Sequence, residues 1–117
     1  MSRRVLAAVN NLFFVGKLQS AAKQASVELT FASSEDDLLE KARGGAELVV
    51  LDLGDHDMDA VEAIKTLRSS PETANVPMLG FVRHTDPGRA EQARQAGCEK
   101  VMARSEFSAQ LVDLLRG

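Results

Sequence analysis

Asp52 is the residue of this chain whose type and position most directly suggest chemistry. It lies near the end of a short apolar run, Glu47-Leu-Val-Val-Leu-Asp-Leu, which polar and turn-forming residues bound on both sides. A continuous run of this length is typical of a strand buried on both faces of a parallel sheet. Burying a carboxylate is costly unless a partner compensates its charge. Asp52 is therefore expected either to be a structural acid with a partner or to mark the ligand-binding edge of the sheet.

A second group of polar residues near Asp52 has side chains of the kinds that bind metals. Asp55, His56 and Asp57 follow the apolar run, and His84 follows a later one. Histidines and acids together are a legitimate ligand set for a transition metal, although no spacing among them is diagnostic. The alternatives are a left-handed turn at Asp57 and an exposed loop position for His84, which would titrate near neutral pH.

The overall composition is that of an ordinary globular protein, with 44% hydrophobic and 26% charged residues. Only 4% of the residues are aromatic, and Trp and Tyr are absent. An aliphatic core is expected, and aromatic stacking platforms for single-stranded nucleic acid are excluded. The net charge of -3 gives no basic footprint for DNA or for a membrane surface. The 117 residues suffice for one domain, 1–117, and are too few for two.

The charges are unevenly distributed along the chain. Between Glu28 and Glu62 eleven acids stand against two bases, whereas five bases stand against three acids between Arg83 and Arg104. This distribution predicts one acidic and one mildly basic edge, which are most simply solvated surfaces.

The cysteine content and the chain ends indicate a cytoplasmic protein. Cys98 is the one cysteine, so a disulfide within the chain is excluded and a reducing compartment fits. No motif around Cys98 indicates a nucleophile, so a small packed side chain is expected. The N-terminus lacks the apolar core of a signal peptide, and no run approaches the roughly 18 apolar residues of a membrane span.

The hydrophobic pattern predicts five strands that alternate with five helices. Strands are expected over 5–9, 27–32, 48–53, 76–82 and 101–103. Helices are expected over 12–25, from a cap at Ser34 to Gly44, over 58–67, from Asp86 to Gly97, and from a cap at Ser105 onward. The first helix is expected to bury a face that starts at Leu12 and includes Phe13 and Phe14. This alternation, with links of a few residues, requires a parallel sheet with helices on both faces.

Ligands of such sheets bind where the strands end, at their carboxyl edge. The residues predicted to lie there are Val9, Asn10, Asp52, Val82, Arg83, His84, Arg104 and Ser105.

At these residues the chain resembles the receiver domain of two-component response regulators, over essentially its whole length. The run ending in Asp52 resembles the phosphoacceptor strand of that family, and Met58-Asp-Ala-Val-Glu resembles the helix that follows. The later family segments are matched by Val76-Pro-Met-Leu, Gly97-Cys-Glu-Lys-Val-Met-Ala-Arg and Phe107. The resemblance implies a flavodoxin-like α/β three-layer sandwich, with a five-stranded parallel sheet of order 2-1-3-4-5 and five helices on both faces.

The resemblance also implies which positions form the site. Receivers of that family bind Mg²⁺ through an acid pair, phosphorylate an Asp, and hold the phosphoryl group with a hydroxyl and a Lys. By this resemblance, the acid pair falls on Val9 and Asn10 and the phosphoacceptor on Asp52. The hydroxyl falls on Val82 and the Lys on Arg104. The family's switch aromatic falls on Val101, so only the phosphoacceptor is kept as it stands.

These replacements predict a degenerate, pseudo-receiver site. Val9 has no ligand atom and Asn10 offers only a neutral oxygen, whereas Mg²⁺ requires near-ideal oxygen geometry. Val82 has no hydrogen bond to give a phosphoryl group, and Val101 has no ring to move. Phosphorylation-driven switching is therefore expected to be impaired, and no cofactor is expected.

Arginine replaces the family's Lys, and this suggests a different role for Asp52. A guanidinium stays charged and presents a planar fork that suits a carboxylate. One hypothesis is that Arg104 or Arg83 pairs permanently with Asp52, and its alternative is that Arg104 points to solvent. The opposing functional hypothesis keeps Asp52 as a phosphoacceptor for a histidine kinase, with Mg²⁺ bound and arginine supplying the lost positive charge.

The expected function is signalling by contact with another protein. The sequence has no glycine-rich phosphate loop, nucleophile elbow or Cys–His motif, so an enzyme is not expected. The resemblance implies a histidine kinase or a downstream signalling protein as partner. The net charge predicts that neither nucleic acid nor a membrane is bound, and the last predicted helix ends at the C-terminus, so no attached output domain is expected. It also implies a possible homodimer through the fourth helix, last strand and last helix, where Arg89, Arg94 and Lys100 would meet an acidic partner.

Overall fold

The computed structural model describes residues 3–54, 58–83 and 86–117. Its elements, in chain order, are β1 (Arg4–Ala8), α1 (Leu12–Ala25), β2 (Glu28–Phe31), α2 (Glu35–Arg43), β3 (Leu48–Asp52), α3 (Ala60–Ser69), β4 (Met78–Val82), α4 (Pro87–Ala96), β5 (Lys100–Ala103) and α5 (Arg104–Arg116). All neighbouring strands pair in parallel, in the order β2-β1-β3-β4-β5. The predicted flavodoxin-like α/β fold is confirmed.

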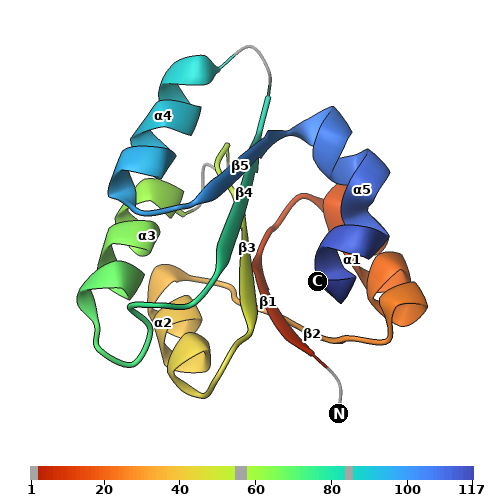
Figure 1. Cartoon of the computed structure of the whole chain (residues 1–117), viewed down its shortest axis with the longest axis horizontal. Helices are drawn as coiled ribbons and strands as arrows, with labels where there is room; N and C mark the ends of the chain where they lie inside the picture. The colour runs from red at the N-terminus through yellow and green to blue at the C-terminus, as the bar shows by residue number, and fades with distance from the viewer. Residues whose placement is uncertain (1–2, 55–57, 84–85) are drawn as a thin grey trace.

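The sheet lies between two layers of helices (Figure 1). Helices α1 and α5 cover one face, and α2, α3 and α4 cover the other. Strands β3 and β4 are buried along their whole length, as the continuous apolar runs predict. Strand β2 alternates between exposed and half-buried residues, as expected for an edge strand. No helix among residues 3–54, 58–83 and 86–117 is long and apolar enough to cross a bilayer.

Helices α1 to α4 each begin at a side-chain cap. The capping oxygens of Asn11, Ser34, Asp59 and Asp86 accept the backbone N–H of the residue two or three positions further on. The prediction that the third helix begins at Met58 is wrong by two residues, because Asp59 caps it and Met58 is buried ahead of it.

Helix α5 begins two residues earlier than predicted, because its N-cap is Ala103 instead of Ser105. Arg104 is its first residue, and Ser105, the predicted cap, lies exposed within its first turn. Ala103 has no capping side chain, but its backbone N–H donates to Oε1 of Glu106 at 3.3 Å, which supplies half of a capping box. Strand β5 therefore runs into α5 without a loop, and this junction fixes the backbone of Arg104 at the sheet edge.

The core on the α1 and α5 face is mainly aliphatic, as expected, and it contains one cluster of three aromatic rings. The rings of Phe81 and Phe107 are stacked with centroids 4.3 Å apart, and the ring of Phe14 lies 4.8 Å from that of Phe81. All three side chains are buried. Five phenylalanines suffice for this because three of them meet at one place.

The predicted inward face of α1 is wrong at its first turn. Leu12 is 85% exposed and Phe13 is 62% exposed, and the buried face starts instead at Phe14. Helical periodicity gives the approximate direction of a face, but it does not tell which residues at the margin of that face, here Leu12 and Phe13, stay exposed.

Cys98 is buried on the opposite side of the sheet, in the core under α4. Its burial raises the pKa of the thiol above its ordinary value. Because the thiolate is the reactive form, this confirms the expectation of a packed side chain.

Two glycines provide a matched test of this packing. A methyl group added at Gly80 in β4 would lie 2.9 Å from Cδ1 of Leu53, whereas one added at Gly16 in α1 meets nothing within 4 Å. Gly80→Ala is expected to lower the free energy of unfolding by about 1–3 kcal/mol through overpacking. Gly16→Ala is expected to raise it by about 0.5–1 kcal/mol, because alanine favours the helix. Urea unfolding followed by circular dichroism measures both, and equal effects of the two substitutions would contradict the packing at Leu53.

Candidate functional site

The carboxyl ends of four strands bring most of the predicted site residues to one edge of the sheet. Asp52 is the last residue of β3 and is in register with Phe81, next to Val82 at the end of β4. Val82 is in register with Ala103, which directly precedes Arg104. On the other side of β3, Ala8 is in register with Leu51, so Val9 follows at the level of Asp52. The edge that the alternating pattern predicts is therefore formed.

The carboxylate of Asp52 is almost completely buried, with its residue 3% exposed. Its Oδ1 accepts the backbone N–H of Gly54 at 3.0 Å. Nη2 of Arg104 lies 3.9 Å from the same oxygen. That distance is an ion pair without a direct hydrogen bond, so the guanidinium compensates the charge of Asp52 mainly through electrostatic attraction.

Arg104 is positioned by an aromatic ring as well as by the carboxylate. Its guanidinium carbon lies 5.5 Å from the ring centroid of Phe14, within the range of a cation–π contact. Its side chain is 27% exposed, and its Nε is buried without a hydrogen-bond partner among the described residues. The structure thus places Arg104 beside Asp52 rather than in solvent.

The side chains flanking Asp52 at the neighbouring strand ends are aliphatic. Val9 is 2% exposed and Val82 is 5% exposed. Val101 is half-buried, whereas Asn10 and Arg83 are exposed at the surface. Among the strand-end residues that the structure describes, the aliphatic side chains of Val9 and Val82 thus flank the carboxylate of Asp52 and the guanidinium of Arg104.

The residues that the structure describes at this edge do not form a ligand set that suits a magnesium ion. Val9 has no ligand atom, Asn10 offers a neutral oxygen, and an Arg cation already lies beside the carboxylate of Asp52. Across residues 3–54, 58–83 and 86–117, no three His, Cys, Asp or Glu side chains group as a metal site would require. Asp55, His56, Asp57 and His84 lie outside the described residues, so the metal-site hypothesis that includes them stays a prediction.

Arg89 on α4 contributes to this edge, although sequence reasoning assigned it to a partner surface. Its Nε donates to the backbone carbonyl of Leu53 at 2.9 Å, and its Nη2 donates to Oδ1 of Asp59 at 3.3 Å. The guanidinium of Arg89 thus joins α4 to Leu53 and Asp59, and its predicted contact with an acidic partner stays a prediction. No local signal predicts a contact between residues this far apart in the chain.

Comparisons with known proteins identify the fold and leave the function open. No protein-family model and no curated protein sequence matches the chain. Solved structures match over nearly the whole length, and they include a response regulator from Hahella chejuensis, with a TM-score of 0.85 at 19% identity over 97% of this chain and 92% of that one.

Two further neighbours have related names. The chemotaxis response regulator CheY4 of Vibrio cholerae has a TM-score of 0.81 at 17% identity, over 98% of this chain and 99% of its own. The receiver domain of a sensor histidine kinase from Pseudomonas aeruginosa, which holds a magnesium ion in its active-site cleft, has a TM-score of 0.84 at 16% identity, over 99% of this chain and 96% of its own. The chain has the receiver fold.

The pairing of Arg104 with Asp52 predicts an energetic coupling between the two residues. Arg104→Ala leaves the buried carboxylate without its cation, so we expect a loss of about 1–3 kcal/mol in the free energy of unfolding. In a double-mutant cycle with Asp52→Asn, the stability lost by the double variant is expected to be smaller than the sum of the two single losses by about 1 kcal/mol or more. Chemical unfolding of the four proteins measures this coupling energy.

The exposed pair of Arg94 and Glu91 on α4 is the matched control, because its atoms lie 3.5 Å apart with both side chains at least half exposed. Its coupling energy is expected to stay below about 0.5 kcal/mol. A coupling between Arg104 and Asp52 as small as that of the control would show that the buried pair is not an interacting unit.

Asp59 predicts a dependence of stability on pH. The backbone N–H of Glu62 holds the pKa of its carboxyl below the ordinary value of 3.8, the hydrogen bond from Arg89 adds to this, and partial desolvation opposes both. Asp59 therefore stabilises the fold above pH 4 or so, and this contribution is lost as the pH falls through the lowered pKa. Asp59→Asn retains a capping side chain but is expected to destabilise the protein at pH 7 and not at the lowest pH. Thermal unfolding from neutral to acidic pH measures this, and a loss independent of pH would contradict it.

Proposed function

We propose that the protein is a pseudo-receiver, a receiver-like signalling module that acts through contact with other proteins in one fixed conformation. The observation that carries this proposal is the ion pair of Arg104 with the buried carboxylate of Asp52. In a receiver fold this carboxylate occupies the position of the phosphoacceptor. A permanent cation beside it provides the positive charge that a switching receiver has to gather around a phosphoryl group.

Access to Asp52 also supports the proposal. The side chain is 4% exposed, so an incoming phosphoryl donor meets little of the carboxylate that would have to attack it. In-line attack requires the nucleophile and the phosphorus to approach closely in a defined orientation. The backbone N–H of Gly54 and the guanidinium of Arg104 both lie at the same oxygen, which further restricts that approach.

The loss of charge neutralisation is the second support. Val9 and Val82 are buried aliphatic residues, and neither ligates a metal nor donates a hydrogen bond to a developing charge. Electrostatic stabilisation of that charge is the main way in which a protein accelerates phosphoryl transfer. The competing function, a phosphoacceptor for a histidine kinase that uses Mg²⁺, rests on the retention of Asp52 beside a cation.

The proposed output is protein contact. A histidine kinase or a downstream signalling protein is the class of partner that the receiver fold suggests. Arg94 and Lys100 are exposed on the side of α4 and β5, where the resemblance places a docking or homodimer surface. Arg89 is engaged with Leu53 and Asp59, so it contributes rigidity to α4 rather than a free charge.

Exposure to acetyl phosphate and Mg²⁺ tests the proposal. Intact-mass measurement is expected to show no added phosphoryl group on the wild-type protein, because Asp52 is buried and the metal is poorly held. Asp52→Asn serves as the blank for phosphorylation at other sites. A substantial fraction of wild-type protein that carries a phosphoryl group absent from Asp52→Asn would refute the fixed-conformation function.

A gain-of-function variant gives the positive control. The combined changes Val9→Asp, Asn10→Asp, Val82→Thr and Arg104→Lys restore the residue types that phosphorylating receivers use. Provided that circular dichroism shows it folded, this variant is expected to gain a phosphoryl group that the additional change Asp52→Asn removes. If the variant gains a phosphoryl group and the wild type does not, the replaced residues are what prevents phosphorylation of the wild-type protein.

A further inference from the structure

The first turn of α1 exposes two large apolar side chains next to each other. Leu12 is 85% exposed and Phe13 is 62% exposed, and among the described residues these are the exposed large hydrophobic side chains. They lie at the start of α1, at the carboxyl edge of the sheet (Figure 1). Contact with a partner would remove this apolar surface from water, which is favourable.

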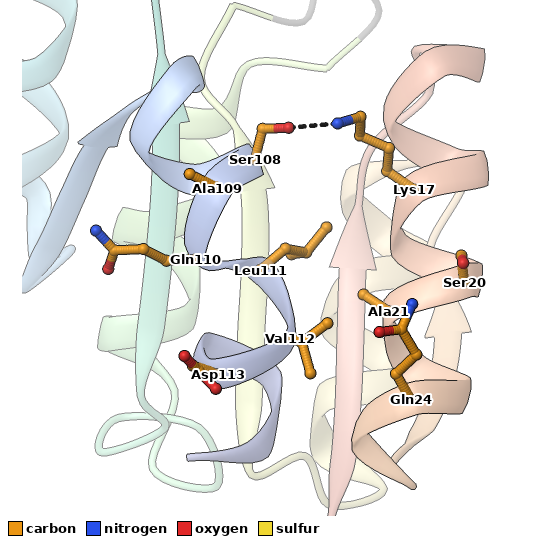
Figure 2. Close-up of a pocket in the computed structure, with 10 residues that line it drawn as sticks. All are labelled: Lys17, Ser20, Ala21, Gln24, Ser108, Ala109, Gln110, Leu111, Val112 and Asp113. Atoms are coloured by element: carbon orange, nitrogen blue, oxygen red, sulfur yellow. Dashed lines mark hydrogen bonds between the residues drawn. The ribbon is translucent and has the colours of Figure 1, made fainter.

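A groove lies between α1 and α5 (Figure 2), and it adjoins Phe13 through Lys17, which lines the groove and contacts the Phe13 ring. Phe13, Lys17, Ser20 and Gln24 recur at three- and four-residue spacing, so they lie along one stripe of α1. Nζ of Lys17 lies 5.1 Å from the ring centroid of Phe13 and donates to Oγ of Ser108 on α5 at 2.6 Å. The groove has a volume of ≈ 240 Å³ and is lined by residues of these two helices only.

The charge around this groove is mainly positive. Between Leu12 and Ala25, helix α1 carries Lys17 and Lys23 and no acidic residue. Arg116 lies at the end of α5, where its Nη2 donates to the carbonyl of Gln24 and its Nη1 lies 3.7 Å from Asp113. The one acid lining the groove is thus already next to a base, and the lysines of α1 remain to attract an acidic partner.

A second copy of the chain does not fit this surface well. A symmetric contact through α1 would bring Lys17 and Lys23 of both copies together, and like charges at an interface are unfavourable. Contact of α1 with the acidic first turn of α2 in another copy would be heterologous, and such contacts form open chains unless they close into a ring.

We propose that the surface formed by Leu12, Phe13, Lys17 and the α1–α5 groove binds an acidic amphipathic helix of another protein. Apolar side chains of that helix cover Leu12 and Phe13, and its acidic side chains pair with Lys17 and Lys23. A groove between two helices is a shape that accepts a third helix along its length. Electrostatic attraction between lysines and acids would then set the orientation and speed the association.

The surface is physically connected to the site at the sheet edge. The rings of Phe13 and Phe14 are in edge-to-face contact with centroids 5.2 Å apart, and Phe14 lies under the guanidinium of Arg104. A helix bound on Phe13 is thus one ring away from the cation that pairs with Asp52. This inference rests on the proposed function, because it names the class of partner that a pseudo-receiver in one fixed conformation would contact.

Titration with designed peptides, followed by NMR of the isotope-labelled full chain, tests this surface. The probe is an amphipathic peptide of roughly 20 residues, long enough to form a helix in water, with a leucine stripe flanked by glutamates. A second peptide has lysines in place of the glutamates. Binding of the glutamate peptide is expected to shift the amide signals of α1 and α5, and the lysine peptide is expected to bind at least about tenfold more weakly.

Matched variants separate the apolar and the charged parts of the surface. Leu12→Ser with Phe13→Ser, and separately Lys17→Glu, are each expected to weaken binding about tenfold, because each changes side chains of the surface. Lys65→Glu, an exposed charge on α3 on the opposite face of the sheet, is the control and is expected to leave binding unchanged.

Several results would overturn this proposal. They are equal binding of the two peptides, binding of neither, or shifts confined to other helices. Self-association of the wild type that Leu12→Ser with Phe13→Ser removes would assign the surface to a second copy instead. The peptide titration contains no phosphoryl donor, so a failure of the peptide to bind does not change the conclusion from the acetyl phosphate experiment. Conversely, phosphorylation of Asp52 in that experiment would refute the proposed function without deciding whether the peptide binds.

Discussion

The constraint on which this structure depends is a carboxylate at the end of a fully buried central strand. Water reaches little of Asp52, so its charge has to be balanced by the protein itself. The Gly54 N–H and the Arg104 guanidinium provide that balance, and the direct join of β5 to α5 delivers the arginine to it. The first residue of a helix is an unfavourable position for a cation, because the helix N-terminus carries partial positive charge. The carboxylate and the Phe14 ring offset this repulsion.

The aromatic cluster under α1 and α5 strengthens the same interaction. Phe14, Phe81 and Phe107 exclude water beneath Arg104, and Val9 and Val82 exclude it beside Asp52. Charges attract more strongly where water is excluded. The 3.9 Å between Arg104 and Asp52 would give little attraction at the surface, but at this buried position it gives a significant one. Arg89 acts from the opposite layer by joining α4 to the carbonyl of Leu53. Asp52 and Leu53 are thus contacted by arginines from the two helical layers on opposite faces of the sheet.

The periodicity of the sequence is enough to predict all five strands, all five helices and their parallel arrangement, since each signal is local. It also places Asp52 and Arg104 at one edge, because parallel strands end together. The exposure of Leu12 and Phe13 was not predictable, because periodicity does not tell which residues at the margin of a helix face stay exposed. The Arg89 contact with Leu53 and the meeting of three phenylalanines join segments far apart in the chain, and no local pattern specifies them. The ion-pair distance at Asp52 likewise depends on side-chain packing.

The burial of Val9 and Val82 has an evolutionary consequence. A carboxylate introduced at position 9 alone would stand beside Asp52 without a metal to separate them, and two buried like charges repel strongly. Loss of the charge of Arg104 would remove the cation beside Asp52. A carboxylate at position 9 is therefore expected to be tolerated only together with a further source of positive charge, so the residues around Asp52 constrain one another's substitution.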